Sequence, residues 1–349
     1  MYFSEGSIGG DIERISTQKI KKFYEEDQGS ELAEVYDGMQ KLDYGESQGS
    51  NGFAISGKLT SSGNAMLLIN PHTSFFFRGE VHVVSEEGLN AYGAVTWGQF
   101  FVYQGFNEKT GWMHTSTGTD IIDEFEETII DGSQGLQYVY GTEKRKVETI
   151  PVKLSYKTDT GMGQNTYEVY RTHHGPITHS NGDKWVATAM MWDPIKALQQ
   201  SFIRTKQNDH QGFRKMMDMR TNSSNNTVFA DASGNIAYYH GNFIPKRNDT
   251  LDYTLPVDGS NPLTDWQGLH EVDENIMVLN PETGWIQNCN STPFTSAGDY
   301  SPRPENYPAY MASFPENFRG VHAISLLSNA DELTIDKLIE LSYDPFPVS

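Results

Sequence analysis

The junction between Gly49 and Ser50 carries the residue types of a self-cleaving nucleophile. Glycine permits a strained backbone that other residues resist, and such strain would let the Ser50 hydroxyl attack the preceding carbonyl carbon. Hydrolysis of the resulting ester would free an N-terminal serine. Its α-amine, with a pKa of about 7.7–8, can act as general base to its own hydroxyl. Taken alone, the dipeptide is more typical of a flexible turn between a helix and a strand.

Two further segments carry groups that could assist a nucleophile. His72 follows Asn70 and Pro71 at the end of a predicted strand, in a loop where functional side chains collect, although a lone histidine is more often structural. The turn that begins at Ser116 continues with threonine and glycine, and its backbone N–H groups could face an oxyanion.

Asp120 and Asp123 come directly after this turn. Carboxylates are hard oxygen ligands, and these two are close enough in sequence to share one calcium ion with a backbone carbonyl between them. An acidic surface loop is the alternative interpretation of the same segment.

A fourth segment supplies polar side chains around a predicted hairpin. Asn226 lies just before the turn at 231–235, and its amide N–H is a suitable neutral donor to a developing oxyanion. Arg247 follows Pro245 and Lys246, and its guanidinium could position Asn226 or a substrate carboxylate. Individually, these are ordinary turn residues.

The elements that must position these residues are mostly strands. Apolar residues recur at helical spacing over residues 11–43, and a polar, glycine-bearing linker covers residues 43–49. From Ser50 onward, short alternating runs between glycine-rich turns predict strands. These predicted strands are 53–57, 65–70, 80–84, 92–97, 126–130, 147–154, 166–172, 184–191, 227–230 and 236–239. Helices are expected at 209–219, at 318–328 and from 334. The pattern indicates an α+β or layered α/β protein.

Composition excludes several function classes. The 349 residues include 26 Lys and Arg against 46 Asp and Glu, so the formal charge is −20, which argues against nucleic acid and anionic membranes as partners. Hydrophobic residues make up 37% of the chain, enough for a large core. No apolar run approaches the roughly 18 residues of a membrane span. The single cysteine, Cys289, excludes an internal disulfide framework.

The ordered set of these segments resembles the penicillin acylase (penicillin amidase) family of N-terminal nucleophile hydrolases. The resemblance runs from Ser50 to the end of the chain and is far more specific than any single motif. The matching pieces are Gly49-Ser50-Asn51, Asn70-Pro71-His72, 112–118, 170–176, 226–238, 265–269, 280–284 and 286–290.

The resemblance implies a role for each candidate residue. Ser50 matches the autocatalytically exposed nucleophile, and His72 matches a histidine found near it in many members. Ser116 falls where the family uses a backbone N–H for the oxyanion hole, and Asn226 falls where it uses a side-chain amide. Arg247 matches the nearby active-site arginine.

The resemblance also implies a metal, a fold and a maturation pathway. Asp120, the Ile122 carbonyl and Asp123 match the calcium-binding turn of those members that bind calcium. The implied fold is the αββα four-layer sandwich of N-terminal nucleophile hydrolases, incomplete in this chain. Residues 1–49 would be the helical end of the α chain plus a linker, and residues 50–349 the first part of the β chain. Members are usually exported, so a periplasmic or secreted location is expected, although residues 1–10 lack a signal-peptide pattern.

The sequence therefore predicts an amidohydrolase that cleaves an N-acylated small molecule through an acyl-enzyme on Ser50, after self-cleavage at Gly49–Ser50. The remainder of its own α and β chains would be its partner. Aromatic residues at 75–77 and 100–106 favour an apolar acyl group, although aromatics on strands usually form core. The alternatives are a non-catalytic β-rich binding domain and an inactive fragment of an acylase.

Overall fold

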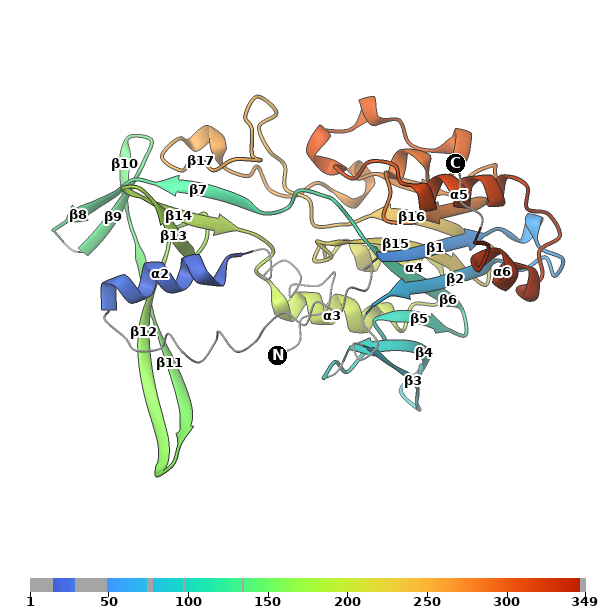
Figure 1. The fold of residues 1–349 in the computed structure, drawn as a ribbon, viewed down its shortest axis with the longest axis horizontal. Coiled ribbons are helices and arrows are strands. Elements are labelled where there is room, and N and C mark those ends of the chain that lie inside the picture. The colour runs from blue at the N-terminus through green and yellow to red at the C-terminus, as the bar shows by residue number, and fades with distance from the viewer. Residues whose placement is uncertain (1–14, 29–48, 74–77, 97, 134, 346–349) are drawn as a thin grey trace.

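The computed structural model describes residues 15–28, 49–73, 78–96, 98–133 and 135–345, and these fall into two regions (Figure 1). The layered body, at the right of Figure 1, contains two stacked sheets with helices on both sides. The β lobe, at the left, contains within the described residues one helix and three small sheets, one of which is a long two-stranded hairpin.

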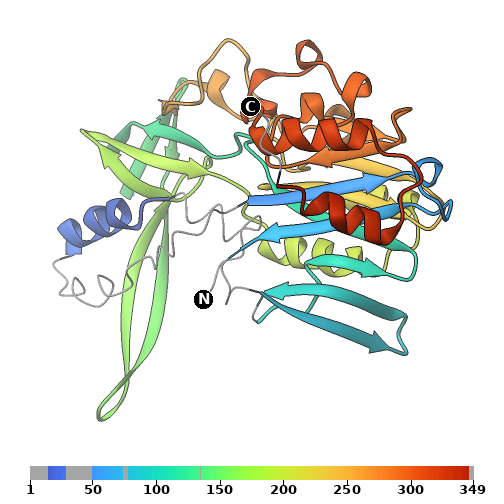
Figure 2. The same cartoon turned by 45° about the vertical axis from the view of Figure 1, so that its right-hand side comes forward.

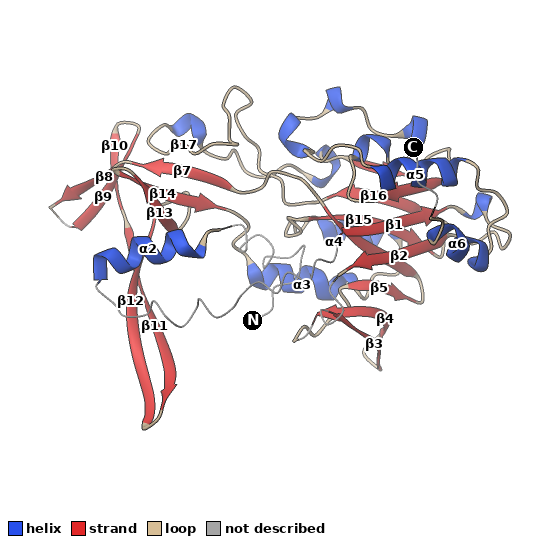
Figure 3. Cartoon of the chain, in the orientation of Figure 1, coloured by secondary structure: helices blue, strands red, loops and turns tan. Residues whose placement is uncertain are grey.

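Two antiparallel sheets form the layered body (Figure 3). The smaller sheet has the order β19-β1-β2, with β19 at Trp285–Asn288, β1 at Gly49–Ile55 and β2 at Met66–His72. The larger sheet has the order β18-β16-β15-β6-β5-β4-β3. Its strands, in that order, are Met277–Leu279, Ile236–His240, Asn225–Asp231, Thr110–Ser116, Gln104–Asn107, Leu89–Thr96 and Arg78–Ser85.

Alternation of side chains along the strands builds the interface between the two sheets. Ala54 of β1, Met113 of β6 and Val228 of β15 are fully buried in one cluster between them. Their neighbours Trp112 and Phe229 point to the opposite face of the larger sheet, as the two-residue repeat of a strand requires. The two sheets thus share one apolar core.

Helices cover the two outer faces. Trp112 and Phe229 pack against Phe213 and Met216 of α4, His210–Met217, which lies beside α3, Pro194–Arg204. On the other side, helices α5, Phe318–Ser328, and α6, Ile335–Ser342, pack on the smaller sheet (Figure 2). The order is helix, sheet, sheet, helix, which is the four-layer arrangement that the sequence predicts.

Side-chain caps fix where these helices begin. Asp193, Asp209, Asn317 and Thr334 each accept a hydrogen bond from a backbone N–H in the first turn. Short 3₁₀ turns occupy Gly57–Leu59, Pro262–Thr264, Val272–Glu274, Pro293–Thr295, Gly298–Tyr300, Pro304–Asn306 and Ala309–Met311.

The β lobe is built on a four-stranded sheet with the order β13-β14-β7-β17. These strands are Ile177–Asn181, Lys184–Ala189, Asp123–Glu127 and Val257–Asp258, and β17 is parallel to β7. The lobe also holds β8, Ile129–Gly132, β9, Gly135–Tyr140, β10, Glu143–Lys146, and the hairpin of β11, Glu148–Thr158, with β12, Gly161–Arg171. Helix α2, Thr17–Gln28, packs on the lobe through Phe23.

The prediction of an α+β fold is confirmed, with differences at particular elements. The strand expected at 126–130 is two strands, because the chain leaves β7 after Glu127 and enters β8 at Ile129. Helix α3 was not predicted. The parts of the predicted N-terminal helix at 11–14 and 29–43, and most of the linker, lie outside the described residues, and the domain boundary at Ser50 stays a prediction. Among the described residues, no helix is long and apolar enough to cross a membrane.

Candidate active site

Ser50 is the second residue of β1, and the sheet buries it at the start of the strand. It lies opposite Pro71 of β2, and 7% of its surface is exposed. The Ser50 hydroxyl donates a hydrogen bond to the carbonyl oxygen of Gly49, with 2.6 Å between the two oxygens. The Ser50 backbone N–H donates to Asn290 Oδ1 at 2.6 Å. The hydroxyl is therefore next to the peptide bond that the prediction expects it to attack.

Two residues that the sequence analysis did not assign to the site hold this junction. Asn290 accepts the Ser50 N–H and donates from Nδ2 to the carbonyl of Ser116 at 3.2 Å. Arg319 of α5 donates to the Ser50 carbonyl at 3.0 Å, to Asn51 Oδ1 at 2.7 Å and to Asn290 Oδ1 at 3.1 Å. Because a Cβ on Gly49 would lie 3.0 Å from Arg319 Nη2, the contact favours glycine there.

Ser116 and Asn226 lie beside the same asparagine-rich group. Ser116 ends β6, and its carbonyl accepts from Asn290 and, at 3.4 Å, from Asn226 Nδ2. Asn226 lies on β15 opposite Thr115, and its Nδ2 also contacts Thr115 Oγ1 at 3.1 Å and Asn288 Oδ1 at 3.3 Å. Asn290 thus links the predicted nucleophile to Ser116, whose carbonyl also accepts from Asn226.

His72 ends β2 directly opposite Gly49. Its Nε2 is 2.9 Å from Asn70 Oδ1 and 3.4 Å from Asn51 Nδ2. Burial, reinforced by the positive charge of Arg319, lowers the pKa of His72. The ring is therefore neutral at pH 7 and is held one residue away from the predicted nucleophile.

Arg247 belongs to a different group, at the edge of the β lobe. Its Nε and Nη2 donate to the two oxygens of Asp123 at 2.7 and 2.9 Å, and both side chains are 1% exposed. Trp266 also donates to Asp123 from its indole nitrogen. Burial raises the pKa of Asp123, while the hydrogen bonds and charge of Arg247 oppose that shift. The side-chain hydrogen bonds of Arg247 hold β7 and do not reach Ser50.

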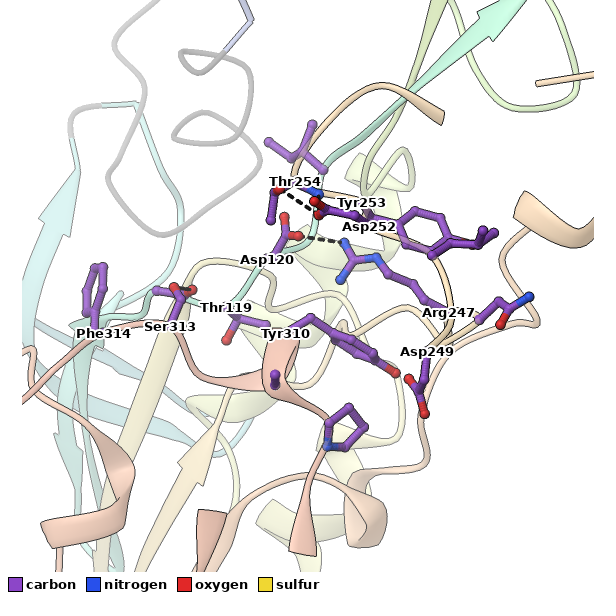
Figure 4. A pocket seen from close by; sticks show the side chains of 16 residues that line it. Thr119, Asp120, Arg247, Asp249, Asp252, Tyr253, Thr254, Tyr310, Ser313 and Phe314 are labelled. Atoms are coloured by element: carbon purple, nitrogen blue, oxygen red, sulfur yellow. Dashed lines mark hydrogen bonds and ion pairs between the residues drawn. The ribbon is translucent and has the colours of Figure 1, made fainter. Parts of the chain in front are cut away.

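A cavity of about 930 Å³ opens beside this ion pair (Figure 4). Arg247 and Asp120 face one another in it, 3.5 Å apart, above the ring of Tyr310. Ile122, Asp249 and Asp252 also line the cavity. Asp120 and Ile122, two of the three predicted calcium ligands, are therefore together beside further carboxylates. The third, Asp123, is already occupied by Arg247 and Trp266, and the calcium site stays a prediction.

The aromatic residues expected to line an acyl pocket divide between core and surface. Phe101 and Tyr103 are buried, and Phe100 and Phe106 are exposed. Phe101 and Tyr103 line a small cavity beside α3. Residues 75–77 lie outside the described part of the chain.

Comparisons with known proteins identify the family of this chain. The family model described as penicillin amidase matches residues 3–348. The chain is 30% identical to penicillin G acylase of Escherichia coli over 221 residues, which are 59% of this chain and 25% of that protein. It is 25% identical to the acyl-homoserine lactone acylase QuiP of Pseudomonas fluorescens strain Pf-5 over 276 residues, 75% of this chain and 32% of that protein.

A solved structure shows the same fold. The thermostable penicillin G acylase from Alcaligenes faecalis aligns with 84% of this chain and 51% of its own, with a TM-score of 0.66 and 19% identity. The expected N-terminal nucleophile hydrolase fold is therefore confirmed. The chain spans only a quarter to a third of the length of the two curated relatives described above. Its match to the family model covers nearly every residue, and the chain belongs to the penicillin amidase family.

Proposed function

We propose that this chain carries the nucleophile-bearing part of an acylase, which hydrolyses the amide bond of an N-acylated substrate through an acyl-enzyme on Ser50. The homologues named as penicillin and acyl-homoserine lactone acylases support a hydrolase acting on amide bonds. The observation that carries the finer proposal is the contact of 2.6 Å between Ser50 Oγ and the Gly49 carbonyl oxygen.

Maturation follows from that contact. Attack of Ser50 Oγ on the Gly49 carbonyl carbon forms an ester, breaks the C–N bond and leaves the Ser50 nitrogen as a free amine. Water then hydrolyses the ester, so that residue 49 ends in a carboxylate and Ser50 becomes N-terminal. Asn290 Oδ1, which accepts the Ser50 N–H at 2.6 Å, is placed to accept a hydrogen bond from the new amine.

The same groups suit the catalytic cycle. With a pKa of about 7.7–8, the new amine takes the hydroxyl proton as Ser50 attacks the substrate carbonyl. Asn226 Nδ2 would donate to the developing oxyanion, and a donor of this kind contributes about 3–4 kcal/mol to transition-state binding. Thr115 and Asn288 hold the Asn226 amide in place before substrate arrives.

The experiment for this proposal is to trap the acyl group. The mature whole protein is mixed with a phenylacetyl amide, quenched in acid within milliseconds and digested for mass spectrometry. We expect the added acyl mass on the peptide that begins at Ser50, and no such mass in Ser50→Ala. Turnover in Ser50→Ala, or an acyl group on another residue, would contradict the role of Ser50.

The substrate, the metal and the location are proposed by class. An apolar acyl group is proposed because burial contributes about 25 cal/mol per Å² without any need for charge. A panel of amides that differ only in the acyl group tests it, and equal turnover of acetyl and phenylacetyl amides would contradict it.

Calcium at Asp120, Ile122 and Asp123 is proposed on the resemblance and on the neighbouring carboxylates. Export to the periplasm or medium remains a proposal drawn from the resemblance.

A non-catalytic binding module is the rival proposal. It would keep the fold without using Ser50, and intact Gly49–Ser50 in the whole protein would favour it. The contacts of Ser50 and Asn290 with the Gly49–Ser50 peptide bond, and of Asn290 and Asn226 with the Ser116 carbonyl, favour the enzyme.

A further inference from the structure

A compact group of imidazoles and carboxylates lies in the β lobe, apart from the Ser50 group. One ligand atom each from Glu127, His173 and His174 lies within 4.8 Å of the others. Asp265 joins them, because its Oδ1 is 2.9 Å from His174 Nε2 and 3.5 Å from His173 Nε2. Two imidazole nitrogens therefore lie within 3.5 Å of one carboxylate oxygen.

We propose that His173, His174 and Asp265 bind a single divalent transition-metal ion of the zinc type, with Glu127 supporting the site from behind His174. Zinc accepts imidazole nitrogen and carboxylate oxygen at about 2.0–2.2 Å and is usually four-coordinate. Three protein ligands leave the fourth position to water. Calcium and magnesium prefer an all-oxygen ligand set, which this group does not offer.

In each proposed ligand, the nitrogen or oxygen atom that would not bind the metal contacts another residue. His174 Nδ1 is 2.8 Å from Glu127 Oε1, and His173 Nδ1 is 3.0 Å from the Tyr138 hydroxyl. The Tyr140 hydroxyl donates to Asp265 Oδ2 at 2.5 Å.

With hydrogen on Nδ1, each imidazole donates to these partners and presents the Nε2 lone pair on the side of Asp265 Oδ1. Metal-ligating histidines in proteins are held in this way by a carboxylate or another acceptor.

One side of the site, at Glu127 and His174, is buried, and the other side, at His173 and Asp265, is open to solvent. The side chains of Glu127 and His174 are 0% and 4% exposed, whereas those of His173 and Asp265 are 29% and 31% exposed. His174 also stacks on Phe125, with 4.0 Å between ring centroids and 6° between ring planes, which fixes the plane of its imidazole. An ion can therefore enter beside His173 and Asp265 and meet oriented ligands.

Bound metal would join three parts of the lobe that are distant in sequence. Glu127 ends β7, the two histidines follow β12, and Asp265 belongs to the loop after β17. Its neighbour Trp266 donates to Asp123, so the same loop also touches the Arg247 ion pair. The proposed role is structural: the ion would hold these segments of the lobe together.

The test is a zinc titration of the purified full chain, stripped of metal, by calorimetry, with cobalt(II) absorption as a second readout. We expect one equivalent of zinc, a rise in Tm, and the visible absorption bands of low-coordinate cobalt. His173→Ala and Asp265→Asn should weaken zinc binding at least tenfold. Both variants change side chains that are partly exposed to solvent, so we expect both proteins to fold.

The control is His82→Ala, an exposed histidine on β3 that pairs with Asn90 in the layered body. It should bind zinc as the unchanged chain does. Zinc binding that survives both His173→Ala and Asp265→Asn, or that is lost equally in His82→Ala, would overturn the proposal. The absence of a stoichiometric equivalent in the unchanged chain would overturn it as well.

Discussion

The surroundings of Ser50 and the buried core of the β lobe organise their polar groups in opposite ways. Around Ser50 in the layered body, hydrogen bonds run mainly between neutral amides, hydroxyls and carbonyls, and Arg319 is the charged member. In the β lobe, the buried groups are ions and imidazoles: Arg247 with Asp123, and His174 between Glu127 and Asp265.

That difference matches what each region is proposed to do. Neutral donors such as Asn226 can be aimed at an oxyanion without first attracting a permanent counter-ion, so their strongest interaction is reserved for the transition state. Buried charges in the lobe instead depend on each other, because loss of one leaves its partner unpaired in a low-dielectric interior. We therefore expect mutations around Ser50 to lower activity more than stability. Mutations of the buried charges in the lobe should lower stability more than activity.

The largest expected effect on stability is from breaking the ion pair of the lobe. Arg247→Met leaves Asp123 buried without its cation, which typically costs about 3–5 kcal/mol of unfolding free energy. Urea denaturation measures it. Arg319→Met in the body is the matched control, because its hydrogen bonds go to neutral oxygens, and it should cost less. An equal loss of unfolding free energy in Arg247→Met and Arg319→Met would contradict the proposed difference between the two regions.

The complementary change in the body is Asn226→Ala. Loss of a single oxyanion donor lowers kcat by about 10²–10³-fold. Steady-state kinetics of the mature protein on a phenylacetyl amide tests this, with thermal unfolding in parallel. A variant that keeps its kcat, or that loses activity only in proportion to unfolding, would show that Asn226 is structural.

Lowering the pH should destabilise the layered body through His240, a buried neutral histidine that lies opposite Asn226 on β16. Burial lowers the pKa of His240 to about 4, below its ordinary value of about 6.5, so below pH 6.5 the unfolded chain takes up a proton that the folded chain refuses.

This contribution to stability is complete above pH 6.5 and is lost as the pH falls toward 4, by at most roughly 3 kcal/mol. His240→Gln should flatten the pH dependence of unfolding between pH 6.5 and 4, measured by urea denaturation at each pH. The exposed His82→Gln should leave it unchanged. An unaltered slope in His240→Gln would contradict the assignment.

The smallest expected effect concerns Thr115, a positioning residue behind Asn226. Thr115→Val removes the hydroxyl that contacts Asn226 and donates to Asn288 at 2.6 Å, at a cost of about 1 kcal/mol. We expect kcat to fall several-fold with KM unchanged, because only the oxyanion donor loses its support. A change confined to Tm would instead make the role of Thr115 purely structural.

The sequence predicts what is periodic and local, and it misses what depends on tertiary contacts. Alternation in β4, β15 and β16 was sufficient to place these strands, whereas β6 was not predicted. Helix α3 was missed, although Ile195, Leu198 and Ile203 recur at nearly helical spacing, and in the structure these side chains are exposed. A local signal did exist there, since Asp193 followed by Pro194 is a typical cap and first helical residue.

The candidate site shows the same division. Ser50, Ser116 and Asn226 were identified from motifs, whereas Arg319 reaches Ser50 across 269 positions of sequence and has no local signal. Asn290 had one, because it lies in the matched segment 286–290, yet nothing in that segment says which atom it contacts. Likewise, spacing cannot show that Arg247 pairs with Asp123, because the partner of a cation is decided by packing.

The central claim is that Ser50 cleaves its own peptide bond, and intact-mass analysis of the whole protein tests it most directly. Unchanged protein should give two chains, one of which begins at Ser50 by N-terminal sequencing, while Ser50→Ala should remain a single chain of undiminished stability. If Ser50→Ala is cut at the same bond, or if the unchanged protein is active while Gly49–Ser50 stays intact, the account of Ser50 as a self-exposed nucleophile is wrong.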